Sequence, residues 1–291
     1  MTTIVYLNGD FVPGEEAKVS LFDHGYLFGD SIFETLRSYE GTIFRLDAHL
    51  DRFSDSARYM KMTLPASRTE LTDLCYETLA RSGLSEAYLR VTVSRGVGER
   101  GIDPDRCPRP TLSIIAKDLP AYPAEAYLTG VPTVIVSLRK IADEALSGRV
   151  KGGNYQNHIL AKMELNQHGV IEGFLLNPQG FVVEGTVSNV FIVKGGSVLT
   201  PSAASGCLEG ITRNVVMELA TRSLGVPAVA GFLTRYDLYT ADECFLTNTL
   251  MEVMPVNRVD GRPIGDGKPG PTTLKLAGLF KQLVATEGRP R

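Results

Sequence analysis

The first 118 residues contain short hydrophobic runs, some of them alternating with polar residues, separated by glycine, proline, asparagine and aspartate. Such runs are typical of β-strands joined by turns. They predict a hairpin over residues 3–20 that turns at Asn8-Gly9-Asp10, a strand pair over 32–39 and 42–44, and strands over 88–94 and 112–116. Apolar residues at helical spacing predict a helix that ends near Met60, with Asp47 as its N-cap, and a second helix over 69–82.

Pro120 and Pro123 interrupt any regular element, so we expect a domain boundary near them. The predicted organisation is an N-terminal α/β domain over residues 1–118, a linker over 119–127 and a second domain over 128–291. The second domain is predicted to contain strands over 131–137, 171–176, 181–183, 190–193, 197–199 and 244–247, and helices over 155–167 and 212–224. Because strands and helices alternate irregularly and many strands form hairpins, the pattern favours a mixed α+β or α/β fold over a doubly wound sheet.

The composition is typical of a soluble globular protein, since 43% of the 291 residues are hydrophobic, 22% are charged and the net charge is −3. No basic stripe, long apolar run or export signal is present, so we expect no nucleic acid or membrane partner and a cytoplasmic location. The widely spaced Cys75, Cys107, Cys207 and Cys244 are expected to be free, buried or partly buried thiols. The four histidines form no metal-binding motif, so no metal is expected.

Lys151 is followed by Gly152 and Gly153 and precedes a predicted helix. A lysine in a shielded site can lose its proton and attack a carbonyl group, and glycines let a backbone approach a ligand closely. Taken alone, however, a lysine beside two glycines more often marks a solvated turn.

Three other positions have both a functional and a structural interpretation. Thr212 opens a predicted helix, where free N–H groups and its hydroxyl could bind a phosphate, or where its side chain could simply cap the helix. Glu184 ends a predicted strand and could hold a protonated pyridine nitrogen, or could be an exposed turn residue. Arg52 could bind a phosphate through two N–H groups, or could extend into water.

The order of six motifs is more specific than any one of them. The segments are FGDSIFETLRSY, HLDRF, KGGNY, VEGTVSNVF, LEGITRNVV and ADECFLTNTLMEVMPV, and together they resemble the class-IV aminotransferase family of pyridoxal phosphate (PLP) enzymes. The resemblance extends over nearly the whole chain, from Tyr6 to Pro271. It implies fold type IV, with two α/β domains and PLP in the cleft between them. It also implies a homodimer, in which Phe28 and the loop over residues 96–103 help to close the partner's site.

The resemblance also implies the roles of individual residues. Lys151 would carry PLP as a Schiff base and transfer the proton, and Glu184 would pair with the pyridine nitrogen. Tyr155 would bond the ring oxygen and Leu208 would pack on a ring face. The phosphate and its surroundings would be contacted by Arg52, Ile211, Thr212, Asn248 and Thr249.

The subfamily depends on residues that would contact the substrate. Thr35, Arg100 and Asn248 resemble 4-amino-4-deoxychorismate lyases, in which the threonine gives a proton to the departing pyruvate and the other two bind a dicarboxylate with Arg90. The segment Phe33-Glu34-Thr35 is also closer to the lyases, whereas the segments around Tyr88 and Lys151 resemble branched-chain aminotransferases; Phe33 and Tyr88 are expected to contact the substrate in either case. We therefore expect the lyase, which yields p-aminobenzoate and pyruvate, slightly ahead of a transaminase. That transaminase would act on branched-chain L-amino acids, D-amino acids or R-amines, with 2-oxoglutarate or pyruvate as acceptor. A cofactor-binding protein without activity is disfavoured because the residues implied in catalysis are retained.

Overall fold

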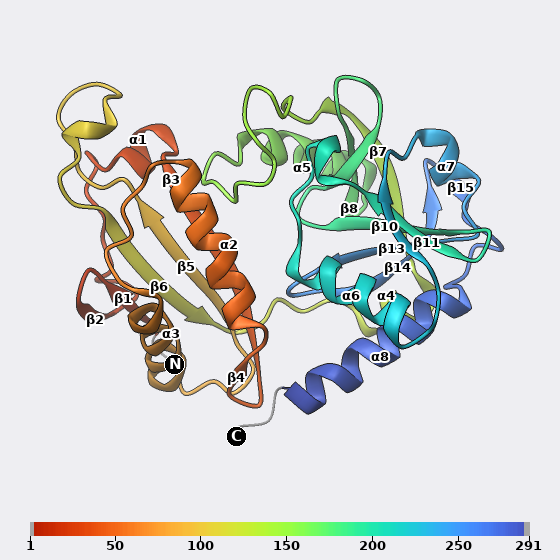
Figure 1. Ribbon diagram of the computed structural model, residues 1–291, viewed down its shortest axis with the longest axis horizontal. Coiled ribbons are helices and arrows are strands. Elements are labelled where there is room, and N and C mark those ends of the chain that lie inside the picture. Colours follow the sequence, from red (N-terminus) through yellow and green to blue (C-terminus); the bar gives the residue numbers. More distant parts are fainter. Residues whose placement is uncertain (1–2, 288–291) are drawn as a thin grey trace. The chain divides into compact units, whose positions relative to one another are not determined.

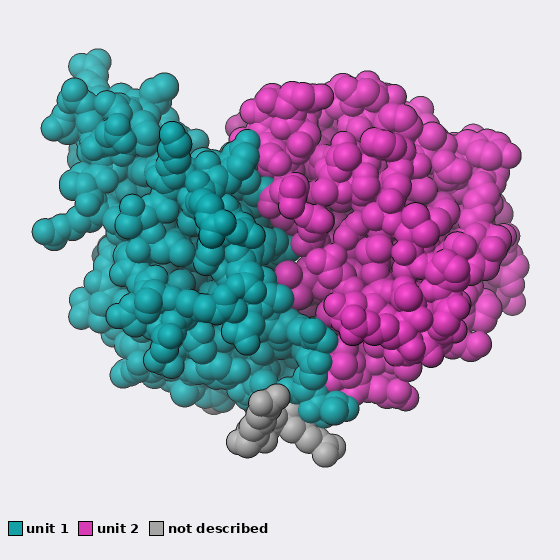
Figure 2. Space-filling view, in the orientation of Figure 1, with its two compact units in different colours: residues 1–120, 150–154, 284–291 teal, residues 121–149, 155–283 magenta. Residues whose placement is uncertain are grey.

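The computed structural model describes residues 3–287, and the chain divides into two compact units (Figures 1 and 2). Unit 1 comprises Met1–Pro120, Val150–Asn154 and Val284–Arg291, and unit 2 comprises Ala121–Arg149 and Tyr155–Leu283. The chain first passes from unit 1 to unit 2 within the expected linker. No single boundary describes the division, however, because the chain returns to unit 1 around Lys151.

In the described part of unit 1, six strands form an antiparallel sheet in the order β2-β1-β6-β5-β3-β4. The strands are β1 (Ile4–Leu7), β2 (Asp10–Pro13), β3 (Ser31–Tyr39), β4 (Thr42–Ile43), β5 (Tyr88–Ser94) and β6 (Thr111–Lys117). The helices are α1 (His24–Phe28), α2 (Leu46–Tyr59) and α3 (Arg68–Ser82), with a 3-10 turn at Pro104–Arg106. α2 packs against β3, and α3 packs against β1, β5 and β6 (Figure 1).

The alternation along β3 and β5 decides which face of this sheet is buried. Leu36 and Leu89 are fully buried and share one apolar core with Phe53 of α2. Thr35 and Arg90 are opposite one another in the register and are only half-buried. Because successive residues of a strand point to opposite faces, the strand pair presents these polar side chains away from the core.

α2 begins at Leu46, before the residue that the pattern predicts. Arg45 precedes it in the left-handed conformation, and no side chain caps the helix. The expectation that Asp47 is the N-cap is therefore wrong: Asp47 lies in the first turn, where its carboxylate accepts a hydrogen bond from Arg68.

In the described part of unit 2, nine strands form one sheet in the order β12-β11-β10-β13-β14-β7-β8-β9, and β15 pairs with β14. The strands are β7 (Val131–Arg139), β8 (Glu172–Leu176), β9 (Val182–Gly185), β10 (Asn189–Lys194), β11 (Ser197–Pro201), β12 (Ala228–Gly231), β13 (Glu243–Asn248), β14 (Glu252–Val259) and β15 (Arg262–Pro263). The pairs β11–β12, β14–β7 and β7–β8 are parallel and the others are antiparallel. The predicted mixed α/β fold is therefore confirmed.

The helices of unit 2 are α4 (Ala124–Thr129), α5 (Gln156–His168), α6 (Ile211–Arg222), α7 (Arg235–Tyr239) and α8 (Pro271–Glu287), whose end belongs to unit 1; a 3-10 turn spans Ala203–Ser205. α4 overlaps the segment expected to be a linker, residues 119–127, and starts directly after Pro123. Proline is compatible with the start of a helix, because its fixed φ suits a helical turn and the first N–H groups need no helical acceptor.

Within residues 3–287, no helix has the length and apolar composition needed to cross a membrane. No group of three or more histidine, cysteine, aspartate or glutamate side chains in the same residues could hold a metal ion. The four cysteines are unpaired; Cys107 is half-buried and the other three are buried, as predicted.

Candidate active site

Lys151 lies in a short segment, Val150–Asn154, that belongs to unit 1 and runs beside β3. Its carbonyl oxygen accepts a hydrogen bond from Phe33 N at 2.9 Å, and Gly153 N donates to Ser31 O at 2.7 Å. A Cβ on Gly153 would overlap Ser31 Oγ, so glycine here permits close packing on β3. The backbone of Lys151 is thus held by the sheet and is not a solvated turn.

The side chain of Lys151 lies over the face of the sheet that α2 and α3 leave uncovered. Its Nζ is 4.7 Å from the centroid of the Phe33 ring, and the guanidinium carbon of Arg90 is 3.6 Å from the same centroid. Thr35 pairs with Arg90 in the β3–β5 register, and Tyr88 lies two residues before Arg90 on β5. Unit 1 therefore brings the predicted catalytic lysine together with four predicted substrate or catalytic residues on one face.

Arg52 is held by a buried carboxylate and does not extend into water. Its Nε donates to Glu34 Oε1 at 2.8 Å and its Nη2 to Glu34 Oε2 at 2.7 Å, while His49 Nδ1 lies 2.8 Å from the same Oε2. Burial raises the pKa of Glu34, but the Arg52 guanidinium and the His49 hydrogen bond outweigh it and hold that pKa well below its ordinary value. Burial lowers the pKa of His49, so a neutral His49 donates through Nδ1 to the ionised Glu34.

The sequence interpretation missed Glu34 and His49. Glu34 is fully buried and His49 is 1% exposed. The available signal was an acidic residue at an inward-facing strand position and a histidine one helical turn before Arg52.

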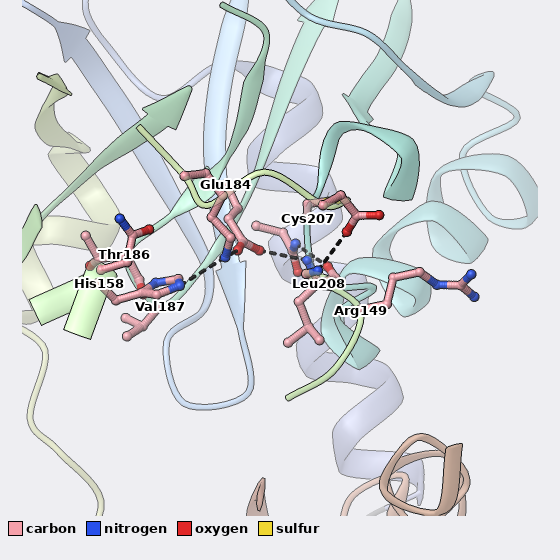
Figure 3. Close-up of polar contacts among 12 residues, drawn as sticks. Arg149, His158, Glu184, Thr186, Val187, Cys207 and Leu208 are labelled. Carbon is pink, nitrogen blue, oxygen red and sulfur yellow. Dashed lines mark hydrogen bonds and ion pairs between the residues drawn. The ribbon is translucent and has the colours of Figure 1, made fainter. Parts of the chain in front are cut away.

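Glu184 lies in β9 and is 5% exposed, which excludes the interpretation as an exposed turn residue. Its Oε2 accepts a hydrogen bond from Leu208 N at 2.9 Å, and its Oε1 accepts one from Lys140 Nζ at 2.5 Å. Lys140 Nζ lies 3.0 Å from His158 Nε2, and His158 Nδ1 lies 2.6 Å from Thr186 O. Figure 3 shows Glu184 between His158 on one side and Leu208 on the other. Lys140 and His158 belong to none of the recognised motifs, and the sequence interpretation missed both.

Two further predicted cofactor residues contact this group. The Tyr155 ring stacks on the His158 ring, with centroids 4.7 Å apart and an interplanar angle of 26°. Leu208 is half-buried and is fixed by its backbone bond to Glu184. Unit 2 thus gathers Glu184, Tyr155 and Leu208 around one hydrogen-bonded network.

α6 begins at Ile211 with Gly210 as its N-cap, and no side chain caps it. The first helical hydrogen bond runs from Asn214 N to Gly210 O and is 2.9 Å long. The N–H groups of Ile211, Thr212 and Arg213 lie before it and have no acceptor within the helix. The alternative that Thr212 caps the helix is wrong, because Thr212 is the second helical residue and is 5% exposed. An uncapped start with the positive end of a helix dipole is suited to bind an anion such as phosphate.

The segment before α6 is fixed by close packing. Asn189 Nδ2 donates to Leu208 O at 2.7 Å, and a Cβ on Gly210 would overlap Asn189 Oδ1. Arg149 Nε pairs with Glu209 Oε2 at 2.9 Å, and Figure 3 shows Arg149 beside Leu208. The backbone that leads into the helix start is therefore held on two sides.

The side chain of Asn248 makes hydrogen bonds that hold the β13–β14 turn. Its Oδ1 accepts hydrogen bonds from Leu250 N at 2.8 Å and Met251 N at 2.7 Å, and its Nδ2 donates to Val187 O at 3.1 Å. These bonds give the side chain a structural role in the turn, and its contact with the cofactor or substrate stays a prediction. Thr249 lies half-buried in the same turn.

Phe28 and Arg100 are not brought to the other site residues of their unit by any described contact. Phe28 ends α1, is 48% exposed and packs edge-on against His24. Arg100 is exposed in the loop after β5, and among the described residues no hydrogen bond, ion pair or ring contact joins it to Arg90. The expectation that Arg90 and Arg100 bind one dicarboxylate is not supported within one chain.

The chain is similar to several known proteins over nearly its whole length. It is 45% identical over 279 residues, covering 96% of each chain, to a Methanocaldococcus jannaschii protein named "Putative branched-chain-amino-acid aminotransferase". It is 34% identical to the branched-chain-amino-acid aminotransferase of Escherichia coli strain K12, over 97% of this chain and 93% of that one.

Solved structures agree with the sequence relatives. A crystal structure of the T.th. branched-chain amino acid aminotransferase with pyridoxamine 5'-phosphate superimposes with a TM-score of 0.93, at 36% identity, over 100% of this chain and 96% of that one. The E. coli enzyme superimposes with a TM-score of 0.94 at 32% identity, over 100% and 97% of the two chains.

The family model described as amino-transferase class IV matches residues 31–259. This range includes every predicted site residue except Phe28, from Phe33 on β3 to Thr249 after β13. Together with the relatives above, the match shows that the chain belongs to the class IV aminotransferase family.

Proposed function

We propose that the chain is a PLP-dependent transaminase that exchanges amino groups between branched-chain L-amino acids and 2-oxoglutarate. The observation that carries the proposal is the 45% identity, over 96% of the chain, to a relative named for branched-chain amino acids. The E. coli and T.th. proteins carry the same activity in their names.

The residues of the structure fit PLP. The T.th. enzyme was crystallised with pyridoxamine 5'-phosphate. In this chain, the uncapped start of α6 suits a phosphate, and the buried carboxylate of Glu184 suits a protonated pyridine nitrogen. When bound, PLP supplies an aldehyde that captures amino groups and a ring that takes up electrons.

The residues of the chain then have distinct tasks. Lys151 Nζ would hold the cofactor covalently and, when released by the substrate amine, would carry the proton removed from the substrate α-carbon. Glu184 would hold the protonated ring nitrogen, Tyr155 would bond the ring oxygen, and Leu208 would pack on a ring face. The phosphate would be held by residues that the resemblance implies: Arg52, Ile211, Thr212 and Thr249.

The uncovered sheet face of unit 1 offers two kinds of contact to substrates. The T.th. enzyme was crystallised with 4-methylvaleric acid and with N-(5'-phosphopyridoxyl)-L-glutamate. We propose that Phe33 and Tyr88 contact the branched side chain and that Arg90 binds the distal carboxylate of glutamate. Thr35, opposite Arg90 in the register, would hydrogen-bond the same substrates.

The comparisons favour this activity over the 4-amino-4-deoxychorismate lyase that the motifs rank first. Asn248 is engaged in the β13–β14 turn and Arg100 is exposed in this chain, so neither residue adds specific support for the lyase. Thr35 is compatible with either activity. D-amino acids and R-amines are less well supported, because the relatives are named for branched-chain amino acids.

The proposal is tested with one preparation of the PLP-loaded protein. L-Leucine, L-isoleucine, L-valine, L-glutamate and their D-enantiomers are added singly, and the loss of the visible PLP band is followed by rapid mixing. Fast conversion by the branched-chain L-amino acids and L-glutamate is expected. Conversion by D-amino acids alone, or formation of p-aminobenzoate from aminodeoxychorismate without transamination, would refute the proposal.

The homodimer remains a prediction. The exposed apolar residues Leu21, Phe22, Leu27 and Phe28 in and before α1 are consistent with a covered surface in the assembled protein. Light scattering after gel filtration is expected to give twice the chain mass of 31.6 kDa.

A further inference from the structure

Behind Glu184, a lysine and a histidine form a hydrogen-bonded chain to which the proposed function assigns no task. Lys140 is 9% exposed, and its Nζ lies 2.5 Å from Glu184 Oε1 and 3.0 Å from His158 Nε2. His158 continues the chain through Nδ1 to Thr186 O. All four residues belong to unit 2, and Figure 3 shows the line from Thr186 through His158 to Glu184.

The partners of His158 determine where its proton lies. Thr186 O is a carbonyl oxygen and can only accept, so His158 Nδ1 must carry a hydrogen. Lys140 Nζ is an ammonium group and can only donate, so His158 Nε2 must offer its lone pair. His158 is therefore the neutral Nδ1–H tautomer, and Lys140 donates both to it and to Glu184.

The end of this hydrogen-bonded series that lies farthest from Glu184, at Thr186, is also fixed. The buried carboxylate of Glu172 accepts hydrogen bonds from Thr186 N at 2.8 Å and Thr186 Oγ1 at 2.6 Å. The Thr186 carbonyl that orients His158 therefore lies on an anchored loop. The Tyr155 ring stacks on the His158 ring and so restrains the imidazole as well. The position of the Lys140 ammonium is thus determined by several packed elements.

Glu184 receives donors on both oxygens, with Leu208 N on Oε2 and Lys140 on Oε1. Each carboxylate oxygen can accept more than one hydrogen bond, so a further donor can be added without displacing either. The carboxylate is buried, and a nearby positive charge acts more strongly there than in water. A proton shared between Glu184 and another base is therefore biased away from Glu184.

We propose that Lys140, oriented by His158, is a positioning residue that keeps the proton of the Glu184–pyridine hydrogen bond on the ring nitrogen of PLP. The proposal rests on the assignment of Glu184 to that nitrogen in the proposed function. The positive charge of Lys140 stabilises the ionised carboxylate and so favours the ion pair over the neutral pair. A protonated ring nitrogen withdraws electrons more strongly, which is the property that transamination requires.

The test is the ¹⁵N NMR spectrum of the protein loaded with PLP labelled at the ring nitrogen, recorded at one neutral pH. The wild type and Lys140→Arg are expected to give the chemical shift of a protonated ring. Lys140→Met is expected to move the shift toward that of an unprotonated ring. Lys194→Met is the matched control, because Lys194 also pairs with an acidic residue in unit 2, Asp237, yet its described hydrogen bonds and ion pair go to Asp237 and Thr240 and not to Glu184 or His158. It is expected to leave the spectrum unchanged.

A Lys140→Met protein that binds PLP and keeps the wild-type shift would overturn the proposal. If that variant fails to fold or to bind PLP, His158→Phe decides: it keeps an aromatic ring for Tyr155 but removes the acceptor that orients Lys140. A partial shift supports the proposal and an unchanged shift overturns it. Glu184→Gln distinguishes a failure of the role proposed for Lys140 from a failure of the assignment of Glu184 to the ring nitrogen. If its shift is also unchanged, the assignment of Glu184 is at fault; if only Glu184→Gln changes the shift, the role of Lys140 alone is refuted.

Discussion

Arg52 donates two hydrogen bonds to the fully buried carboxylate of Glu34, from Nε to Oε1 at 2.8 Å and from Nη2 to Oε2 at 2.7 Å. This two-point contact fixes the plane of the guanidinium group, because Arg presents its donors in a rigid fork. The Nε–Nη2 edge faces Glu34. If Arg52 binds the PLP phosphate, it does so with an orientation that Glu34 imposes.

Replacement of Glu34 by Gln should therefore weaken PLP binding, although Glu34 itself is not assigned to the cofactor. Loss of one charged hydrogen bond corresponds to about 1.5–3 kcal/mol, or an increase of about 10- to 100-fold in the dissociation constant. The measurement is a titration of the apoprotein with PLP. Arg52→Lys should cause a similar loss, and the double variant should lose little more than either single variant. Additive losses in this cycle would show that the two residues act independently.

The stability of the protein should fall in acid because of the same cluster. The pKa of His49 is lower in the folded protein than its ordinary value of 6.5. His49 therefore contributes stability above about pH 6.5 that is lost as the pH falls, at most about 1.4 kcal/mol per pH unit. Glu34, whose folded pKa is also lowered, adds a loss in the same direction below its ordinary value of 4.5. Urea unfolding between pH 7.5 and 4 measures this slope.

His49→Gln should flatten the upper part of that pH dependence. Gln keeps a hydrogen-bond donor toward Glu34 but does not titrate. His168→Gln is the control, because His168 is exposed at the end of α5 and should leave the slope unchanged. Equal slopes in the wild type and His49→Gln would show that His49 does not titrate differently in the folded and unfolded states.

Lys151→Ala should abolish the covalent attachment of PLP. Borohydride reduction of the wild type should add the cofactor to the peptide that contains Lys151, as detected by mass spectrometry. Lys117→Ala changes an exposed lysine of the same unit and should leave the visible band intact. Labelling of another lysine in the wild type would contradict the assignment of Lys151.

Arg90→Gln should separate the two substrate classes. The guanidinium group of Arg90 stacks on Phe33 and is held by Thr92 Oγ1 at 3.2 Å, which leaves its position well defined on the uncovered face. Removal of its charge should reduce the rate with L-glutamate by about 10- to 100-fold, while L-leucine is affected much less. Single-turnover rates with each amino acid give the comparison. An equal loss of rate with both substrates would show that Arg90 contacts a group common to L-glutamate and L-leucine, not the distal carboxylate of glutamate.

Gly210→Ala should weaken PLP binding and destabilise the protein, because its Cβ would overlap Asn189 Oδ1 at the start of α6. Gly278→Ala is the matched control: it lies in α8 with no atom within 4 Å of the added Cβ. That change should raise stability by about 0.5–1 kcal/mol through helix propensity. Thermal unfolding and PLP titration of both variants test the contrast. Wild-type affinity in Gly210→Ala would show that the helix start does not bind the phosphate.

Much of the secondary structure was predictable from local patterns. The alternation along β3 and β5 and the helical spacing along α2 identify these elements, because side-chain periodicity is a property of a short segment. β14 was not predicted, and Pro255 within it explains the omission, since proline argues against a strand. The N-caps of α2 and α6 were wrong, because a threonine or aspartate near a helix start does not reveal whether its side chain reaches the backbone.

The ordered motifs of the sequence were enough to predict the family, the fold class, and Lys151, Glu184 and the segment before α6 as candidate site residues. Three contacts became visible only in the folded chain: Arg52 pairs with Glu34, Asn248 holds a turn, and Lys140 donates to Glu184. Lys140 follows β7 directly and lies 18 residues from His158 in α5 and 44 from Glu184 in β9. Their meeting depends on which strands and helices become neighbours, and side-chain patterns within one segment carry no information about that.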